Sequence, residues 1–178
     1  MEPNGKKQEN ANAAKDLRDL FASGLKDIYY AEKLVEKELP KRFKNATSPE
    51  LANALKNHLS ETEQQLSRLE QVFNVVGIKH TAKKCEAMEG IIKENEKIIK
   101  DTKPGTVRDA GIIASVQKVK HYEIATYGTL HAYAKTLGED KAANLLAMNL
   151  EEEKNLDAKL TGIALTAINN QAASASLK

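Results

Sequence analysis

The sequence is poor in aromatic side chains and nearly free of cysteine. Aromatic residues make up 4% of the 178 residues and tryptophan is absent, so leucine, isoleucine, valine and alanine must build any core. Cys85 is the only cysteine, which excludes an intramolecular disulfide framework and a thiolate metal cluster. A single cysteine fits a reducing compartment, and we therefore expect a cytoplasmic protein.

An excess of charge of one sign is also lacking. Lysine and arginine number 27 against 25 aspartate and glutamate residues, which gives a net charge of +2. This balance offers no electrostatic case for binding nucleic acid or a membrane surface. No run approaches the ~20 apolar residues of a membrane span, and the first residues contain no apolar segment of a signal peptide. We expect neither nucleic acid nor a membrane as a partner.

The sequence does have helical periodicity along most of its length. Composition predicts a disordered tail over residues 1–15, one domain over residues 16–168 and a flexible tail over residues 169–178. Pro40 and the segment Asn45–Pro49 are expected to end the first helix of the domain. The apolar periodicity predicts four long helices and one shorter third segment, over residues 16–41, 49–76, 82–100, 107–137 and 140–168.

The connections between these segments predict the topology. Short links join the first helix to the second and the last two to each other, so each pair should form an antiparallel hairpin. The segment between the hairpins, about 30 residues with the short helix inside it, is too long for a simple turn. Two hairpins joined by one long crossover are typical of an all-α, ferritin-like four-helix bundle.

Carboxylates occupy positions where the helical stripes require apolar side chains. Glu32 and Glu123 each interrupt such a stripe, and Glu153 lies between Leu146 and Leu160 in steps of seven. Each carboxylate desolvated without compensation costs several kcal/mol. The stripes place no lysine or arginine beside these three residues, so a hard dication is the most economical partner.

The second helix follows this pattern less regularly. Glu61 lies about 100° from the centre of its stripe at Thr62. His58 and Gln65 lie between them, and together these side chains would form a polar seam if it turned inward. Carboxylates that converge from four helices on a bundle interior typically hold two iron or manganese ions.

Several short segments resemble those of the YciE/YciF-type ferritin-like bacterial stress-response family. The similarity extends over about residues 16–168 and is carried by Asp27–Lys33, His58–Thr62, Cys85–Gly90, His121–Leu130 and Glu152–Asp157. The resemblance implies a ferritin-like bundle, often dimeric, with a di-iron-type site. We therefore expect a homodimer.

Applied residue by residue, the resemblance points to a set of metal ligands. The first choices are Glu32, Glu61, Glu123 and Glu153, and further candidates are His58, Glu152 and Asp157. Aligning the second and fourth helices pairs Glu61 with Glu152, so the choice between Glu152 and Glu153 stays open, although the stripe favours Glu153. The histidines of the wider ferritin pattern are missing, because Gln64 and Leu156 stand three residues after Glu61 and Glu153.

Two hypotheses about function follow. The first is a ferritin-like stress-response protein that binds two iron or manganese ions and handles iron, oxygen or peroxide at its carboxylates. Whether it turns over a substrate is left open. The second is a helical-bundle interaction or assembly module whose inward carboxylates hold protons or water and no metal.

Overall fold

The computed structural model describes residues 13–175, which form an all-helical bundle without any strand in that range. Residues 1–12 and 176–178 of the two predicted tails lie outside the described residues. The last helix continues past the predicted boundary at residue 168, as far as Ser174. The elements are α1 (Leu17–Asn45), α2 (Pro49–Val75), α3 (Glu86–Asp101), α4 (Thr106–Thr136), α5 (Asp140–Ile163), a π-helical turn (Ala164–Ile168) and α6 (Asn169–Ser174).

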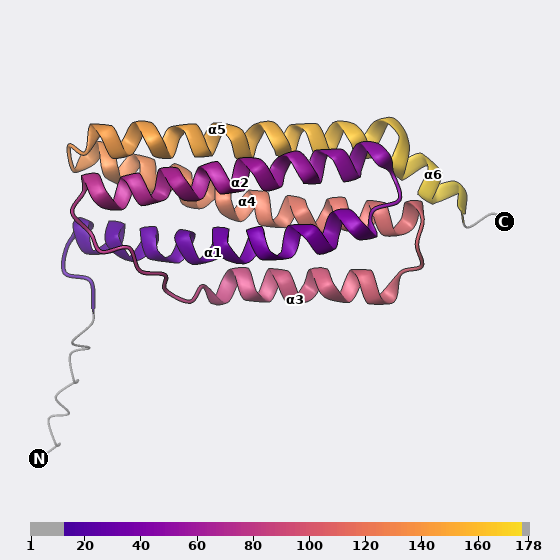
Figure 1. The fold of residues 1–178 in the computed structure, drawn as a ribbon, viewed down its shortest axis with the longest axis horizontal. Coiled ribbons are helices and arrows are strands. Elements are labelled where there is room, and N and C mark those ends of the chain that lie inside the picture. Colours follow the sequence, from indigo (N-terminus) through magenta and orange to yellow (C-terminus); the bar gives the residue numbers. More distant parts are fainter. Residues whose placement is uncertain (1–12, 176–178) are drawn as a thin grey trace, which may run out of the picture.

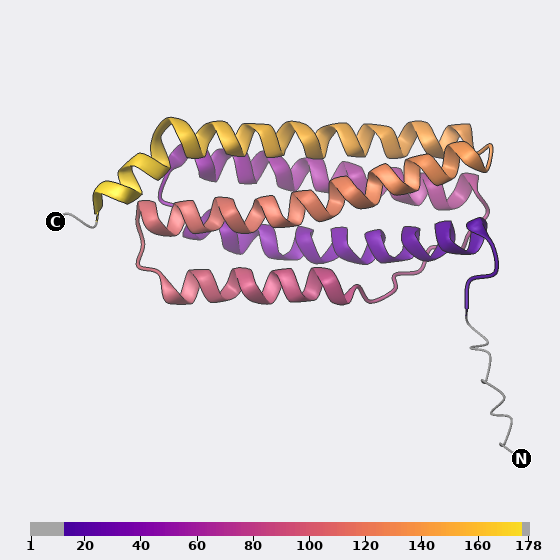
Figure 2. The same cartoon turned by 180° about the vertical axis from the view of Figure 1, so that it is seen from behind.

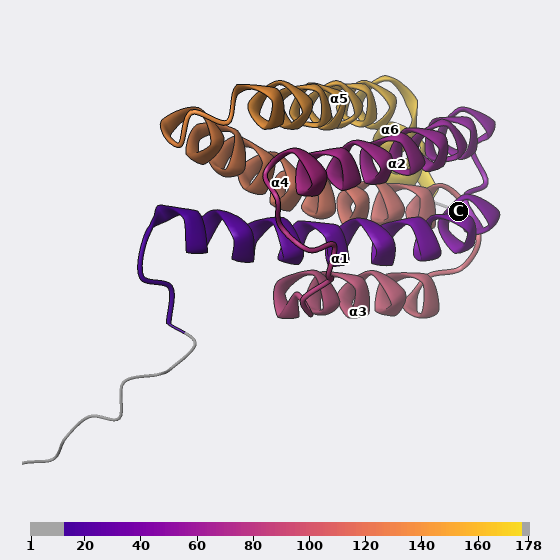
Figure 3. The same ribbon diagram turned by 60° about the vertical axis from the view of Figure 1, so that its left-hand side comes forward.

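The four long helices lie side by side along one axis. α1 packs antiparallel to α2, and α4 packs antiparallel to α5 (Figure 1). Contacts of α2 with α5 and of α1 with α4 close the bundle. α3 lies on the outside against α4 and α1, as the views from behind and from the side show (Figures 2 and 3). The chain between the two hairpins therefore runs the length of the bundle, which confirms the predicted all-α bundle with a helix in its long connection.

Local sequence explains where these helices begin and end. The Asp16 side chain accepts a hydrogen bond from the Asp19 amide at 2.9 Å, and Ser48 does the same for the Leu51 amide at 3.3 Å. Both are N-caps that satisfy amides left free by the first turn of a helix. Gly138, with a φ of 74°, follows α4 and permits the tight link into α5.

The predicted end of the first helix near residue 41 is wrong, because α1 continues through Pro40 and ends at Asn45, the first residue of the other segment expected to close it. A proline inside a helix removes one backbone hydrogen bond and costs about 3 kcal/mol. Leu39 and Arg42, on either side of Pro40, are both buried. Burial on both sides of the proline offsets that cost, so packing overrides the local signal.

Leucine, isoleucine, valine and alanine side chains fill the core between the helices, as the composition predicts. Phe21, Phe73 and Tyr127 are the largest apolar side chains among them, each fully buried. Among residues 13–175, none of the helices has the length and apolarity needed to cross a membrane.

Two glycines of α4 provide a test of how closely the outer helix packs. A Cβ added at Gly111 would lie 2.5 Å from Cγ2 of Ile98 on α3, whereas one at Gly128 would meet nothing within 4 Å. We expect Gly111→Ala to lower the free energy of unfolding by roughly 1 kcal/mol, since overpacking outweighs the gain in helix propensity. Gly128→Ala, the matched control, should raise it by up to about 1 kcal/mol. Urea denaturation of both variants measures this, and a stable Gly111→Ala would contradict the close packing of α3.

Candidate functional site

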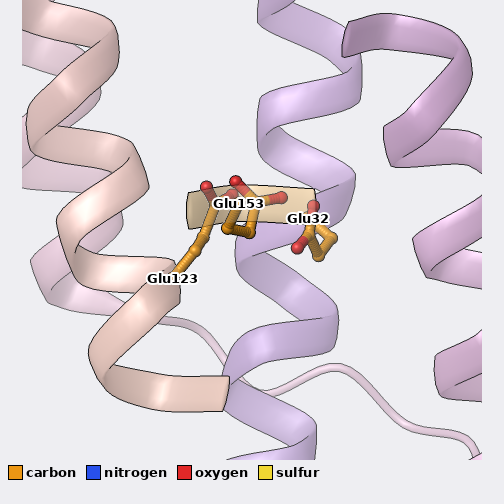
Figure 4. A group of neighbouring side chains, drawn as sticks. All are labelled: Glu32, Glu123 and Glu153. Atoms are coloured by element: carbon orange, nitrogen blue, oxygen red, sulfur yellow. The ribbon is translucent and has the colours of Figure 1, made fainter. Parts of the chain in front are cut away.

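Three buried carboxylates meet in the middle of the bundle, each from a different helix. Glu32 of α1 and Glu123 of α4 are 0% exposed and Glu153 of α5 is 1% exposed. One carboxylate oxygen of each lies within 4.8 Å of the others. Figure 4 shows the three side chains pointing toward one another. The structure thus brings together the three glutamates that the helical stripes single out, and it places Glu153, not Glu152, in the centre.

A lysine lies among these carboxylates, contrary to the expectation that no cationic side chain would be beside them. Lys120 is 0% exposed, and its Nζ forms ion pairs with Oε2 of Glu123 and Oε2 of Glu153. Lys120 precedes Glu123 by three residues on α4, so the two side chains lie one turn apart on neighbouring positions of the helix surface. Lys120 flanks the apolar stripe of α4, so the stripe alone does not reveal it, and its spacing of three residues from Glu123 is the signal that the sequence carries.

His58 of α2 forms a third contact with the ammonium group of Lys120. It is 1% exposed, and its Nε2 lies 2.8 Å from Nζ of Lys120. An ammonium group only donates, so Nε2 accepts and the imidazole proton resides on Nδ1. Burial, followed by the charge of Lys120, lowers the pKa of His58 well below its ordinary value. The histidine is therefore a neutral acceptor at physiological pH.

The three glutamates differ from an ordinary buried carboxylate because some of their oxygens have no donor. Oε2 of Glu32 and Oε1 of both Glu123 and Glu153 find no hydrogen-bond partner among the described residues. Asp109, which is 1% exposed, shows the ordinary case. Its two oxygens accept three hydrogen bonds of 2.6–2.8 Å from Thr47 and Ser48. A buried acceptor without a donor costs about 1–3 kcal/mol, so the central glutamates need protons, water or a cation.

Burial and mutual repulsion shift the protonation of these groups. Burial, followed by the charge of Glu153, raises the pKa of Glu32 to about 8, although Tyr127 donates a hydrogen bond to it at 2.6 Å. The pKa of Glu123 is raised well above its ordinary value by the same two causes. Burial alone would lower the pKa of Lys120, but Glu123, Glu153 and Glu32 outweigh it and raise that pKa. The lysine stays charged while the carboxylates compete for protons.

The remaining candidates lie outside this centre. Glu61 has a side chain that is 43% exposed, and it lines a surface pocket between α2 and α5 together with Glu152. Glu152 pairs with Arg68 of α2. Asp157 accepts a hydrogen bond from Gln117 at 3.2 Å.

Of the polar seam on α2, only part turns inward. His58 and Gln65 are buried there, while Glu61 stays at the edge, with its Oε2 3.9 Å from Nδ1 of His58.

Fold and site together define a class: an all-helical bundle with a buried centre of three carboxylates and one lysine. The chain belongs to the family described as "Domain of unknown function (DUF892)", whose model matches residues 16–173. Protein YciF of Escherichia coli K12 is a relative, 44% identical over 159 residues that cover 89% of this chain and 96% of that protein. The resemblance to YciF-type proteins is thereby confirmed.

Solved structures share the fold. The crystal structure of the E. coli stress protein YciF matches with a TM-score of 0.84 and 44% identity over 88% of this chain and 99% of the other. YcfI of Rhodopseudomonas palustris, described as "a putative structural protein", matches with a TM-score of 0.83 and 44% identity over 85% and 96%. A protein of Xanthomonas campestris pv. campestris, 19% identical with a TM-score of 0.74 over 92% and 100%, shares the fold alone.

The raised pKa of Glu32 predicts how stability depends on pH in chelator-treated protein. The pKa rises from 4.5 to about 8, so between these values the folded state keeps a proton that the unfolded state has lost. Stability contributed by this group is therefore present below the lower value and is lost as the pH rises, by up to about 1.4 kcal/mol per pH unit. Glu32→Gln removes the dependence while preserving shape and the acceptor for Tyr127.

We expect the free energy of unfolding of Glu32→Gln, relative to the parent, to increase between about pH 5 and about pH 7.5. Urea denaturation at a series of pH values measures it. Glu63→Gln, a change at an exposed position of α2, is the control and should give no such trend. A constant difference between Glu32→Gln and the parent would show that Glu32 carries the same charge in both states.

Proposed function

We propose that this chain is a ferritin-like stress-response protein that binds iron or manganese through Glu32, Glu123 and Glu153. The observation that carries the proposal is the convergence of three buried carboxylates whose oxygens lack donors. Hard dications of this kind prefer carboxylate oxygen, and a shared cation would compensate all three groups at once. The relation to a stress protein supports the physiological setting.

The residues present fit a metal ion, but they provide fewer neutral histidine ligands than a typical two-metal centre of a helical bundle does. A bundle centre that holds two metals draws a glutamate from each of four helices and a histidine from two of them. Here α2 contributes His58, whose Nε2 accepts from Lys120, and Leu156 of α5 stands where a histidine is common. Three carboxylates with free oxygens remain, and these suffice for one hard cation.

The residues around the centre have separable tasks. An iron or manganese ion held there would supply one-electron redox chemistry toward oxygen or peroxide. Glu32, Glu123 and Glu153 would bind it, and Tyr127 orients Glu32 through its hydrogen bond of 2.6 Å. Ile28 and Val119 are buried one helical turn before Glu32 and Glu123, and apolar side chains at these positions exclude bulk water from the carboxylates.

Metal analysis tests the proposal directly. Protein stripped with a chelator, loaded with Mn(II) or anaerobically with Fe(II), and then desalted should retain about one metal ion per chain. Glu123→Gln should weaken binding by at least about tenfold, since it removes a charged ligand, and the same metal concentration should raise the Tm of the parent by more than that of Glu123→Gln. Glu61→Gln is the matched control on a half-exposed glutamate and should bind as the parent does.

Retention below about 0.2 metal ions per chain after loading would overturn the proposal. Equal loss of binding in Glu61→Gln and Glu123→Gln would indicate that the metal site lies nearer to the surface pocket that Glu61 lines.

A second candidate is a metal-free structural or assembly module. The ion pairs of Lys120 favour it, because they compensate part of the buried charge without any metal. The description of YcfI from R. palustris as "a putative structural protein" points the same way. For this candidate, added Mn(II) or Fe(II) leaves the Tm of the parent unchanged.

The cytoplasmic location and the homodimer expected from the sequence remain part of the proposal. The single cysteine, buried at the start of α3, suits a reducing compartment. Light scattering of the purified chain determines whether two copies associate.

A further inference from the structure

The contacts of Lys120 use every donor that its ammonium group has. An ammonium carries three N–H donors and no acceptor. Its partners here are Oε2 of Glu123, Oε2 of Glu153 and Nε2 of His58. Three donors thus meet three acceptors contributed by α2, α4 and α5. The ammonium is coordinated on all its free sides, in the way that a small cation would be.

The central carboxylates also have oxygens that do not contact Lys120. Oε1 of Glu123 and Oε1 of Glu153 have no partner among the described residues, and neither has Oε2 of Glu32. One oxygen of Glu123 and one of Glu153 face the ammonium while the other stays free, so these two carboxylates would bridge Lys120 and whatever binds on the free side. The carboxylates therefore offer further oxygens to a second cation, beside those that the ammonium of Lys120 already uses.

We infer that Lys120 is a built-in cation that restricts this centre to a single divalent metal ion. This inference rests on the proposed function. Charge balance supports it: three carboxylates are neutralised by one ammonium and one dication, whereas a second dication would leave an excess of positive charge in a buried site. Arg42 is also buried and interacts with Glu123, but its larger partner is Glu38.

The lysine is also held in place by the fold. Its side chain is fully enclosed, and the neutral imidazole of His58 offers it an acceptor from α2. Withdrawal from the centre would leave Oε2 of both Glu123 and Glu153 without a donor, which is strongly unfavourable in a buried site. A second metal ion that took Oε2 of Glu123 and Glu153 would leave the enclosed ammonium with only Nε2 of His58 as an acceptor, and a buried charge without its partners is strongly unfavourable.

The test is the number of metal ions bound. Lys120→Glu replaces the ammonium with a fourth carboxylate, so two dications would then neutralise the centre. We expect the parent to retain about one Mn(II) per chain and Lys120→Glu about two, measured by mass spectrometry of the metal and of the protein in the same sample. Electron paramagnetic resonance should show spin-coupled Mn(II) in the variant alone. Lys118→Glu, at an exposed lysine 2.6 Å from Glu94, is the control and should retain one.

Two ions in the parent, or one in Lys120→Glu, would overturn the inference while leaving the proposed function intact. No metal in the parent would overturn the proposed function first. If Lys120→Glu does not fold, Lys120→Met provides the measurement, because removing the ammonium removes its repulsion of the bound dication. Its affinity for Mn(II) should rise at least about tenfold over the parent, and an unchanged affinity would contradict the inference.

Discussion

The desolvation of three carboxylates in one small volume is the constraint on which the rest of this structure depends. Glu32, Glu123 and Glu153 are enclosed by the bundle that their own helices form. An ionised carboxylate in such surroundings costs several kcal/mol, a large share of the stability of an ordinary domain. The neighbouring groups can be understood as responses to that cost: Tyr127 donates to one carboxylate, Lys120 pairs with two, and His58 orients the lysine.

These responses are incomplete, and the incompleteness distinguishes this centre from a structural ion pair. Asp109 is as deeply buried, yet each of its oxygens has a donor, and it fastens the α1–α2 turn to the start of α4. The oxygens left over on the three glutamates have no such explanation within the described part of the fold. A core with unsatisfied acceptors gains free energy from any ligand that supplies positive charge, which couples binding at the centre to the stability of all four long helices.

The sequence predicts the helices and the three central glutamates because both follow from periodicity. The pattern places Glu32, Glu123 and Glu153 on apolar stripes, and burial follows from that position alone. The same pattern does not predict whether Glu61 and Lys120 are buried, because both lie beside a stripe. Whether a flanking side chain turns inward depends on which helix packs against it: α5 leaves Glu61 at an edge, while α2 and α5 enclose Lys120. The helix end predicted at Pro40 is wrong for a related reason, since packing of Leu39 and Arg42 decides the length of α1.

A lysine among carboxylates changes what a charged bundle core can do. A core of carboxylates alone could accept two dications, or protons in their absence, and its charge would vary with whatever is bound. An ammonium tethered to α4 supplies a fixed positive charge that cannot diffuse away, so part of the compensation is present before any ligand arrives. The fixed charge limits the cost of the metal-free state, and the same charge repels a second cation. Tolerance of an empty centre and restriction to one metal ion would then have the same cause.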